Sequence, residues 1–237
     1  TIPNSVTSIG SYAFYDCTHL GAITVDSLNS FYSSADGVLF DKSTNTLIQC
    51  PGAKAGSYTV PDNVTHIESG AFFNCLNLGG VTIPNSVTGI GDSAFDSCTS
   101  LTNITISDNL TDIDDWTFAK CWGLQSVTLP NSITSIGRYA FYYCAGLTSI
   151  SIPNNVTNIG IGAFANCWAL QNVTFPTNVA SIGDRAFYWC TNLTGLHFKG
   201  NAPGVGSDIF YNATNAIVYS LPGTTGWGAT FGGLPTL

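Results

Sequence analysis

Apolar residues return along this chain in one fixed order with a period of 23 residues. The pattern T-I-P-N-x-V-T-x-I-G-x-x-A-F-x-x-C-x-x-L-x-x-I fits seven units, which start at Thr1, Thr59, Thr82, Thr105, Thr128, Ser151 and Thr174. A period of this length indicates one supersecondary unit stacked many times, because a single unit cannot bury its apolar face alone. The sequence therefore predicts a solenoid of roughly nine coils.

Each junction between units reads L-x-x-I-x-I, as in Leu147, Ile150 and Ile152, where the last two apolar residues flank a Thr or Ser. Alternation of this kind is typical of a strand, so we expect one short parallel strand per coil. A proline such as Pro84 or Pro153 follows in most units. Because proline has no N–H for a ladder, the strand should end there.

The A-F-x-x-C segment has apolar spacings of one, three and four residues, which suit a single helical turn. Its phenylalanine recurs in every unit and predicts a buried aromatic spine. The members of this spine are Phe14, Phe72, Phe95, Phe118, Phe141, Phe164 and Phe187.

Seven of the eight cysteines fall in the same repeat position: Cys17, Cys75, Cys98, Cys121, Cys144, Cys167 and Cys190. Structural metal sites use clustered spacings such as C-x-x-C, which this chain lacks. We therefore expect a ladder of buried thiols that fill one interior slot per coil, and neither disulfides nor nucleophiles.

Two segments depart from the regular unit. Residues 24–58 equal one unit plus 12 residues, and apolar runs around the polar tip 41–46 predict a β-hairpin at 36–51 that projects from the solenoid. This hairpin is either a binding prong or decoration, and decoration is the preferred interpretation. The segment 197–237 keeps the strand as His197 and Phe198, then loses the period and becomes rich in Gly and Pro. We expect repeats over 1–196 and a terminal cap over 197–237.

The unit is similar to the BspA-like leucine-rich repeat, in which L-x-x-I-x-I-P-x-x-V-x-x-I-G-x-x-A-F-x-x-C recurs with the same period. Residues 1–23 and 59–196 match it closely, and 24–58 resembles a variant unit of the family. The resemblance implies a right-handed leucine-rich-repeat solenoid with parallel strands on the concave face and short helical turns and loops on the convex face. It also implies a secreted or cell-surface recognition module, often one for adhesion.

The charge composition limits the classes of molecule that the chain is expected to bind. Only 8% of the 237 residues are charged, and six Lys and Arg against 14 Asp and Glu give a net charge of −8. Nucleic acid and anionic membranes need a concentrated cationic face, so we expect neither as a partner. The sequence also has no apolar run near 18 residues, so membrane insertion is not expected.

Catalysis needs several groups that converge in one place, and identical coils offer no such place. One unit is acidic, with Asp108, Asp112, Asp114 and Asp115 between positions 108 and 115. Calcium needs about six converging oxygens, so these residues are expected to form a solvated acidic edge. We predict no enzyme, no catalytic or metal-binding residues and no cofactor.

Two surfaces remain as candidates for recognition. The concave face should present hydroxyl and amide groups from Thr82, Asn103, Thr105, Gln125, Thr128, Ser151, Gln171, Asn172 and Thr174. An aromatic edge should be formed by Trp116, Trp122, Tyr139, Tyr142, Trp168 and Trp189. The first suits a protein partner and the second a glycan, although the rings could instead pack between coils. A passive stalk is the third alternative.

Overall fold

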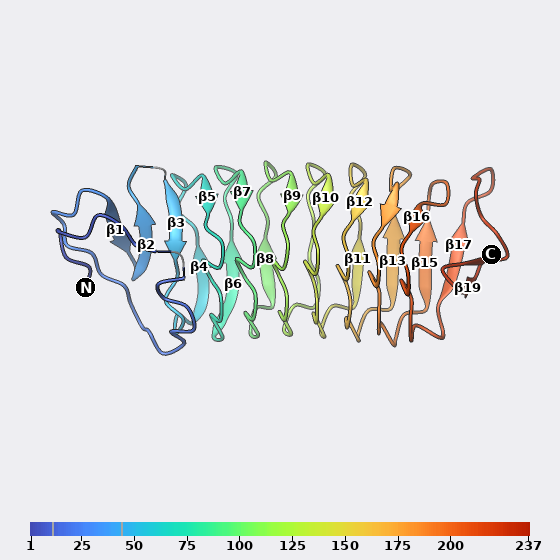
Figure 1. The fold of residues 1–237 in the computed structure, drawn as a ribbon, viewed down its shortest axis with the longest axis horizontal. Coiled ribbons are helices and arrows are strands. Elements are labelled where there is room, and N and C mark those ends of the chain that lie inside the picture. Colours follow the sequence, from blue (N-terminus) through green and yellow to red (C-terminus); the bar gives the residue numbers. More distant parts are fainter. Residues whose placement is uncertain (11, 44) are drawn as a thin grey trace.

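The computed structural model describes residues 1–10, 12–43 and 45–237 of the chain. These residues form an elongated parallel β-solenoid of about eight turns, with the two termini at opposite ends (Figure 1). No helix occurs among the described residues. The predicted solenoid is confirmed, with about eight turns instead of the roughly nine expected. Its core is one continuous column of buried apolar side chains from Val38 to Leu234.

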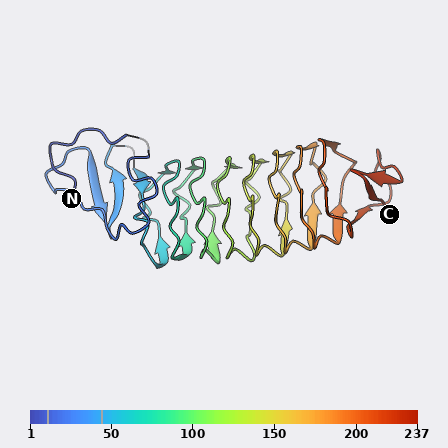
Figure 2. The ribbon, with the colours of Figure 1, turned by 60° about the horizontal axis from the view of Figure 1, so that its bottom comes forward.

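The predicted strand of each coil forms the first ladder, which lies along one side of the stack (Figure 2). Its strands pair in parallel, with Thr82 opposite Thr105 in the next coil. Between Thr105 and Ser149 one coil has no assigned strand, although Val127 and Leu129 keep the buried alternate positions. The strands are β4 (Gly56–Thr59), β6 (Leu78–Thr82), β8 (Asn103–Thr105), β11 (Ser149–Ser151), β13 (Asn172–Phe175), β15 (Gly195–Phe198) and β17 (Ile217–Ser220).

A second parallel ladder, which the sequence did not indicate, is built from the x-I of each V-x-x-I-G segment. Every one of its strands has two residues and a single buried Ile or Val at most, so no alternation is visible in the sequence. The strands are β5 (His66–Ile67), β7 (Gly89–Ile90), β9 (Asp112–Ile113), β10 (Ser135–Ile136), β12 (Asn158–Ile159), β14 (Ser181–Ile182) and β16 (Gly204–Val205).

The A-F-x-x-C segment is not helical, so the predicted helical turn is wrong. Every second backbone N–H in this segment donates to a carbonyl of the next coil. The Phe95 N–H donates to the Thr117 carbonyl at 2.9 Å, and the Ser97 N–H donates to the Ala119 carbonyl at 2.8 Å. The N–H groups between them close tight turns within the coil, as from Asp96 to the Ser93 carbonyl at 3.0 Å. Bonds between coils therefore take the groups that a helix would use internally.

Two residues in each such segment have left-handed backbone, which also prevents a helix. In one coil they are Trp116 (φ 59°) and Lys120 (φ 55°), and in the next Tyr139 (φ 54°) and Tyr143 (φ 61°). This conformation costs an L-residue roughly 1–2 kcal/mol, so it persists only because the bonds between coils impose it.

The aromatic spine is confirmed from Phe72 to Phe187, where five successive pairs of rings stack with centroids 4.7 to 5.4 Å apart. Phe210 extends it, 5.8 Å from Phe187. Phe14 is not part of the spine, contrary to the prediction. The 35-residue unit separates it from Phe72, and it packs half-buried against a small second core that contains Tyr32 and Leu39.

The thiol ladder is buried from Cys75 to Cys190, together with Cys50. Cys17 is exposed, so the predicted burial is wrong at that position. All eight cysteines are free. From Cys98 onward each Sγ donates to the carbonyl of the phenylalanine 26 residues earlier, for example Cys144 to Phe118 at 3.1 Å. Burial raises the pKa of the Cys190 thiol to about 12.

The predicted hairpin forms, but it does not project from the solenoid. Strands β1 (Tyr32–Ala35), β2 (Val38–Asp41) and β3 (Thr46–Gln49) make an antiparallel meander, and β3 pairs in parallel with β5. The meander thus extends the second ladder through the pairing of β3 with β5. Its Leu39 and Leu47 side chains are fully buried, so the meander is part of the body of the solenoid. Thr44, at the predicted tip, lies outside the described residues.

The period also continues further than the sequence suggested. Strand β16 pairs with β14, and β17 pairs with β15, so the segment 197–237 begins with another coil. Alanines at the Cys and Leu positions, Ala213 and Ala216, hide this coil in the sequence. After Ser220 the short hairpin of β18 (Thr230–Phe231) and β19 (Leu234–Pro235) places Phe231 against Phe198, at 5.4 Å between centroids. That this segment acts as a cap stays a prediction.

The thiol ladder gives a direct test of the fold. Because a thiol reacts as the thiolate and burial disfavours that form, only Cys17 should react with a thiol-specific disulfide reagent in the native protein. One equivalent is expected under native conditions and eight in denaturant. Rapid reaction of several thiols without denaturant would contradict the buried ladder.

The spine gives a second test. Phe141→Ala should lower the free energy of unfolding by about 3–5 kcal/mol, because its ring is fully buried between Phe118 and Phe164. Phe14→Ala, outside the spine, should cost less than about 2 kcal/mol. Urea denaturation of both variants measures the difference, and equal losses would show that the ring stack is not special.

Candidate functional site

The outward side chains of the first ladder form a surface that we call the strand face. Eight of its nine predicted residues are exposed and Thr174 is half-buried; the exposed ones are Thr82, Asn103, Thr105, Gln125, Thr128, Ser151, Gln171 and Asn172. The parallel register aligns Thr59, Thr82 and Thr105 in one column, which Ser151 and Thr174 continue further along the stack. The structure therefore brings these residues together on one surface.

The strand face carries no formal charge from Asp, Glu, Lys or Arg, since none occurs in the seven strands of the first ladder. Its polarity comes from hydroxyls and amides, which both donate and accept hydrogen bonds. Beside it, a column of threonines bonds neighbouring coils together, as from Thr102 Oγ1 to the Gly79 carbonyl at 3.0 Å and Thr148 Oγ1 to the Gln125 carbonyl at 3.3 Å. That second column fixes the spacing of the rungs.

Two further residues of the strand face were not among the predicted site residues. His197 and Tyr219 follow Thr174 in register, and their rings stack at 4.9 Å with 9° between the planes. The neighbouring column, which contains Asn172, has no side chain at Gly195. A Cβ there would lie 2.5 Å from Asn172 Oδ1 and 2.8 Å from His197 Nε2. The 23-residue period already placed His197 in a strand, so it could have been added to the candidate residues, whereas Tyr219 is shifted by one residue from the period.

The aromatic edge divides into two parts. Trp116 stacks on Tyr139 at 4.3 Å, and Tyr142 meets both rings edge-on at 5.6 Å. All three are half-buried, and a Cβ on Gly162 would overlap the Tyr139 ring. These three rings pack mainly against their neighbours in adjacent turns.

The other tryptophans of the edge face outward. Trp122 is 51% exposed, Trp168 39% and Trp189 41%. Trp122 and Trp168 occupy the same repeat position two coils apart, with Ala145 between them. The edge of Trp168 contacts Tyr143 at 4.8 Å, so its orientation is fixed by packing.

The acidic unit does not gather its carboxylates around one point. Burial acts to raise the pKa of Asp112, but hydrogen bonds from the hydroxyls of Ser135, Thr111 and Thr134 outweigh it and hold this pKa below its usual value. The pKa of Asp114 is raised instead, first by burial and then by neighbouring carboxylates. Among the described residues, no three His, Cys, Asp or Glu side chains are placed to hold a metal ion.

The part of the chain that the structure describes also contains no helix of the length and hydrophobicity needed to cross a bilayer.

Comparison with solved structures shows that the chain is similar to bacterial leucine-rich repeat proteins. It is 39% identical to a leucine-rich cell surface protein from Faecalibacterium prausnitzii, with a TM-score of 0.69, over 73% of this chain and 46% of that one. It is 31% identical to the leucine-rich repeat protein TpLRR of T. pallidum, with a TM-score of 0.68, over 76% of this chain and 86% of that one. The chain thus spans less than half of the F. prausnitzii protein.

The pneumococcal vaccine antigen PcpA shares the fold, with 23% identity and a TM-score of 0.61 over 94% of this chain and 50% of that one. Curated protein sequences give no significant match. The family described as BspA type leucine-rich repeat region matches residues 1–51, 49–167 and 117–225, in six copies. The chain belongs to this BspA-type leucine-rich repeat family.

Proposed function

We propose that this chain is a non-enzymatic recognition module, exposed at the cell surface or secreted, that binds a protein partner through the strand face. The observation that supports this most is the uncharged array of hydroxyls and amides along successive rungs. The membership of the family and the similarity to a cell surface protein support the location and an adhesion role.

The strand face has the physical properties of a protein-binding surface. Its backbone is held by hydrogen bonds on both sides of each inner strand, so little ordering entropy is lost on binding. A stable interface covers about 800 Å² on each partner, which several adjacent rungs supply. Without fixed charges, affinity should come from hydrogen bonds and shape, and association should depend little on salt.

The same regularity supports the absence of catalysis. Neighbouring rungs carry the same residue types, such as Thr82 and Thr105, so the strand face does not assemble a nucleophile, a base and an orienting group in one place. A passive stalk remains the alternative, and a binding experiment separates it from the adhesin.

The strand face is tested by binding of the whole chain to immobilised extracellular-matrix proteins: fibronectin, laminin and collagen. For any partner that binds, Asn172→Arg should weaken affinity at least about tenfold, because it buries an unpaired charge in the interface. Thr157→Arg is the matched control, since Thr157 is exposed just before the second ladder. Changing the salt from about 50 to about 500 mM should alter affinity less than about threefold.

Surface plasmon resonance measures the affinity of each variant and the dependence of affinity on salt. If Thr157→Arg weakens binding and Asn172→Arg does not, the partner contacts the second ladder and the proposal fails. The absence of binding to every probe favours the stalk.

The outward tryptophans favour glycan binding as a second candidate function. Trp122 and Trp168 present exposed rings at equivalent places in two coils, and the Trp168 ring is held by its contact with Tyr143. Such rings stack on the apolar faces of sugars. A glycan array run with the purified chain should then give saturable binding.

Trp122→Ala should lower the affinity for such a glycan by about two- to tenfold. Tyr211→Ala, which removes an equally exposed ring from the last coil, should leave it unchanged. A flat array would remove this candidate without affecting the protein-binding proposal.

A further inference from the structure

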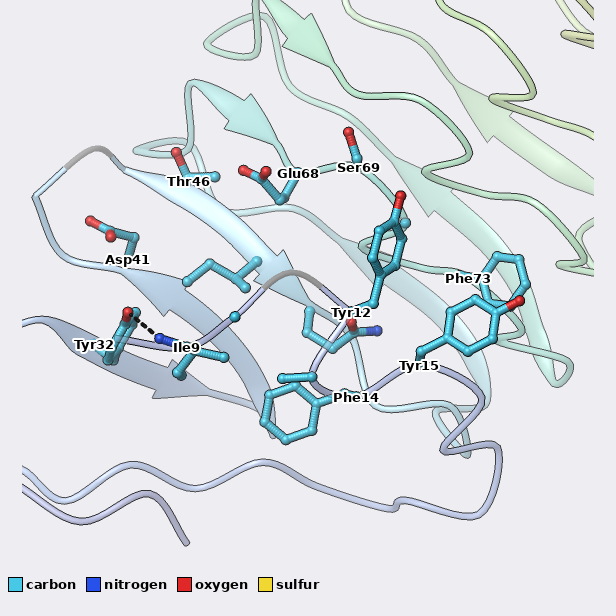
Figure 3. A pocket seen from close by; sticks show the side chains of 15 residues that line it. Ile9, Tyr12, Phe14, Tyr15, Tyr32, Asp41, Thr46, Glu68, Ser69 and Phe73 are labelled. Atoms are coloured by element: carbon cyan, nitrogen blue, oxygen red, sulfur yellow. Dashed lines mark hydrogen bonds between the residues drawn. The ribbon is translucent and has the colours of Figure 1, made fainter. Parts of the chain in front are cut away.

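A cavity lies where the 35-residue unit interrupts the regular stack of coils. It has a volume of about 400 Å³ and lies between the first coil, the meander and the coil that begins at Thr59 (Figure 3). Sites that bind small molecules have volumes of about 300–1,000 Å³, so this cavity is large enough for one ring-sized ligand.

Three aromatic rings form one wall of the cavity. The Tyr15 ring stacks on Phe73 at 4.6 Å, and the Tyr12 ring meets Tyr15 at 5.9 Å with 84° between the planes. Figure 3 shows Tyr12 extending from the first coil toward Ser69. A Cβ on Gly70 would lie 3.5 Å from Tyr12 Cε1, so this ring lies against the backbone of Gly70. Contacts with two segments therefore hold the position of the Tyr12 ring.

The Tyr12 ring is more exposed than a ring at the same repeat position elsewhere. Tyr139 occupies this position in a later coil, where Trp116 stacks on it at 4.3 Å and leaves it half-buried. Tyr12 is 60% exposed, and among the described residues no ring stacks on it in parallel. Because Tyr12 lines the cavity, its flat face is open to a ligand there.

The polar groups around the cavity favour a neutral ligand that carries hydroxyls. Glu68 and Ser69 both line the cavity and are exposed. A carboxylate accepts hydrogen bonds from hydroxyls, and a serine hydroxyl both donates and accepts them. None of the described residues that line the cavity is Lys, Arg or His. An anionic ligand would therefore gain no ion pair with the lining and would be repelled by Glu68.

The same lining favours neither a cation nor a wholly apolar ligand. Asp41 also lines the cavity, but its Oδ1 already accepts hydrogen bonds from the Ser43 N–H and hydroxyl, both at 2.7 Å. Glu68 is exposed, and the attraction between an exposed carboxylate and a cation is weak in water. An apolar ligand would cover the Ser69 hydroxyl and the Glu68 carboxylate without forming hydrogen bonds to them.

We propose that this cavity binds one ring of a neutral carbohydrate. The apolar C–H face of the sugar stacks on the open face of Tyr12, and the sugar hydroxyls form hydrogen bonds with Glu68 and Ser69. The source of the sugar is either the end of a longer glycan or a free monosaccharide. Neither the strand face nor the outward tryptophans line the cavity, so this site does not depend on either candidate function.

The test is a titration of the whole chain, followed by NMR, with glucose, galactose and N-acetylglucosamine, each as the free sugar and as its methyl glycoside. At least one should bind saturably below about 50 mM and shift the backbone amide signals of Gly70 and Phe73. N-acetylneuraminic acid, cyclohexanol and n-butylammonium serve as an anionic sugar, an apolar ring and a cation for comparison. Each should bind at least about fivefold more weakly than the best neutral sugar.

Tyr12→Leu should weaken the binding of the neutral sugar at least about fivefold, because it removes the flat face and keeps an apolar side chain. Tyr211→Leu is the matched control, because it removes a ring that is 52% exposed in the last coil, outside the cavity. It should leave the affinity within about twofold of the unaltered chain.

Glu68→Gln should raise the affinity for N-acetylneuraminic acid relative to the neutral sugar at least about threefold, because it removes the repelling charge with almost no change in shape. Asp92→Asn removes one carboxylate from an exposed position in the next coil, outside the cavity, and should leave this ratio unchanged.

A methyl glycoside that binds at least as tightly as its free sugar identifies the end of a glycan as the source, and tighter binding of the free sugar identifies a monosaccharide. The proposal is overturned if no neutral sugar saturates, if cyclohexanol or n-butylammonium binds as well, or if Tyr12→Leu and Tyr211→Leu have equal effects. Sugar binding that Trp122→Ala removes and Tyr12→Leu does not belongs to the aromatic edge, and it also overturns the proposal. None of these outcomes bears on binding to the strand face.

Discussion

Backbone hydrogen bonds between successive coils set the offset of about 23 residues on which the other regularities depend. The Thr88 N–H donates to the Thr65 carbonyl at 2.9 Å, and the Phe72 N–H to the Ala94 carbonyl at 2.7 Å. Once the offset is fixed, every side chain lies beside the side chain of the same repeat position in the next coil. The phenylalanine spine, the thiol ladder and the strand face are therefore three consequences of one constraint.

The constraint also explains why the interior slot holds cysteine. The Phe118 carbonyl accepts the Cys121 N–H of its own coil at 3.3 Å and the Cys144 Sγ of the next coil at 3.1 Å. A thiol is small enough for the slot and supplies a weak donor for the second lone pair of this carbonyl. Alanine fits the slot but supplies no donor, and it occurs in the last coil as Ala213, so the Phe187 carbonyl accepts the Cys190 N–H at 3.3 Å without a thiol donor from the next coil.

The sequence predicted those features that an apolar period encodes directly. The strand of the first ladder and the spine from Phe72 to Phe187 follow from it, and so do the exposed positions of the strand face. The helical turn was wrong because spacings of one, three and four also fit two tight turns with left-handed residues such as Trp116. The cavity lined by Tyr12, Tyr15 and Phe73 could not be predicted, because it depends on a contact between Tyr15 and Phe73 that no local pattern contains.

A perfectly repetitive surface cannot fix the position of a partner along its own axis. A ligand that binds Thr82 and Thr105 would find almost the same groups one coil further, with little difference in free energy. Specific placement must therefore come from positions where the repeat is broken. On the strand face the repeat is broken where the stacked rings of His197 and Tyr219 replace the threonine column, beside the missing side chain at Gly195. A partner of the proposed kind would therefore be fixed along the axis at that end.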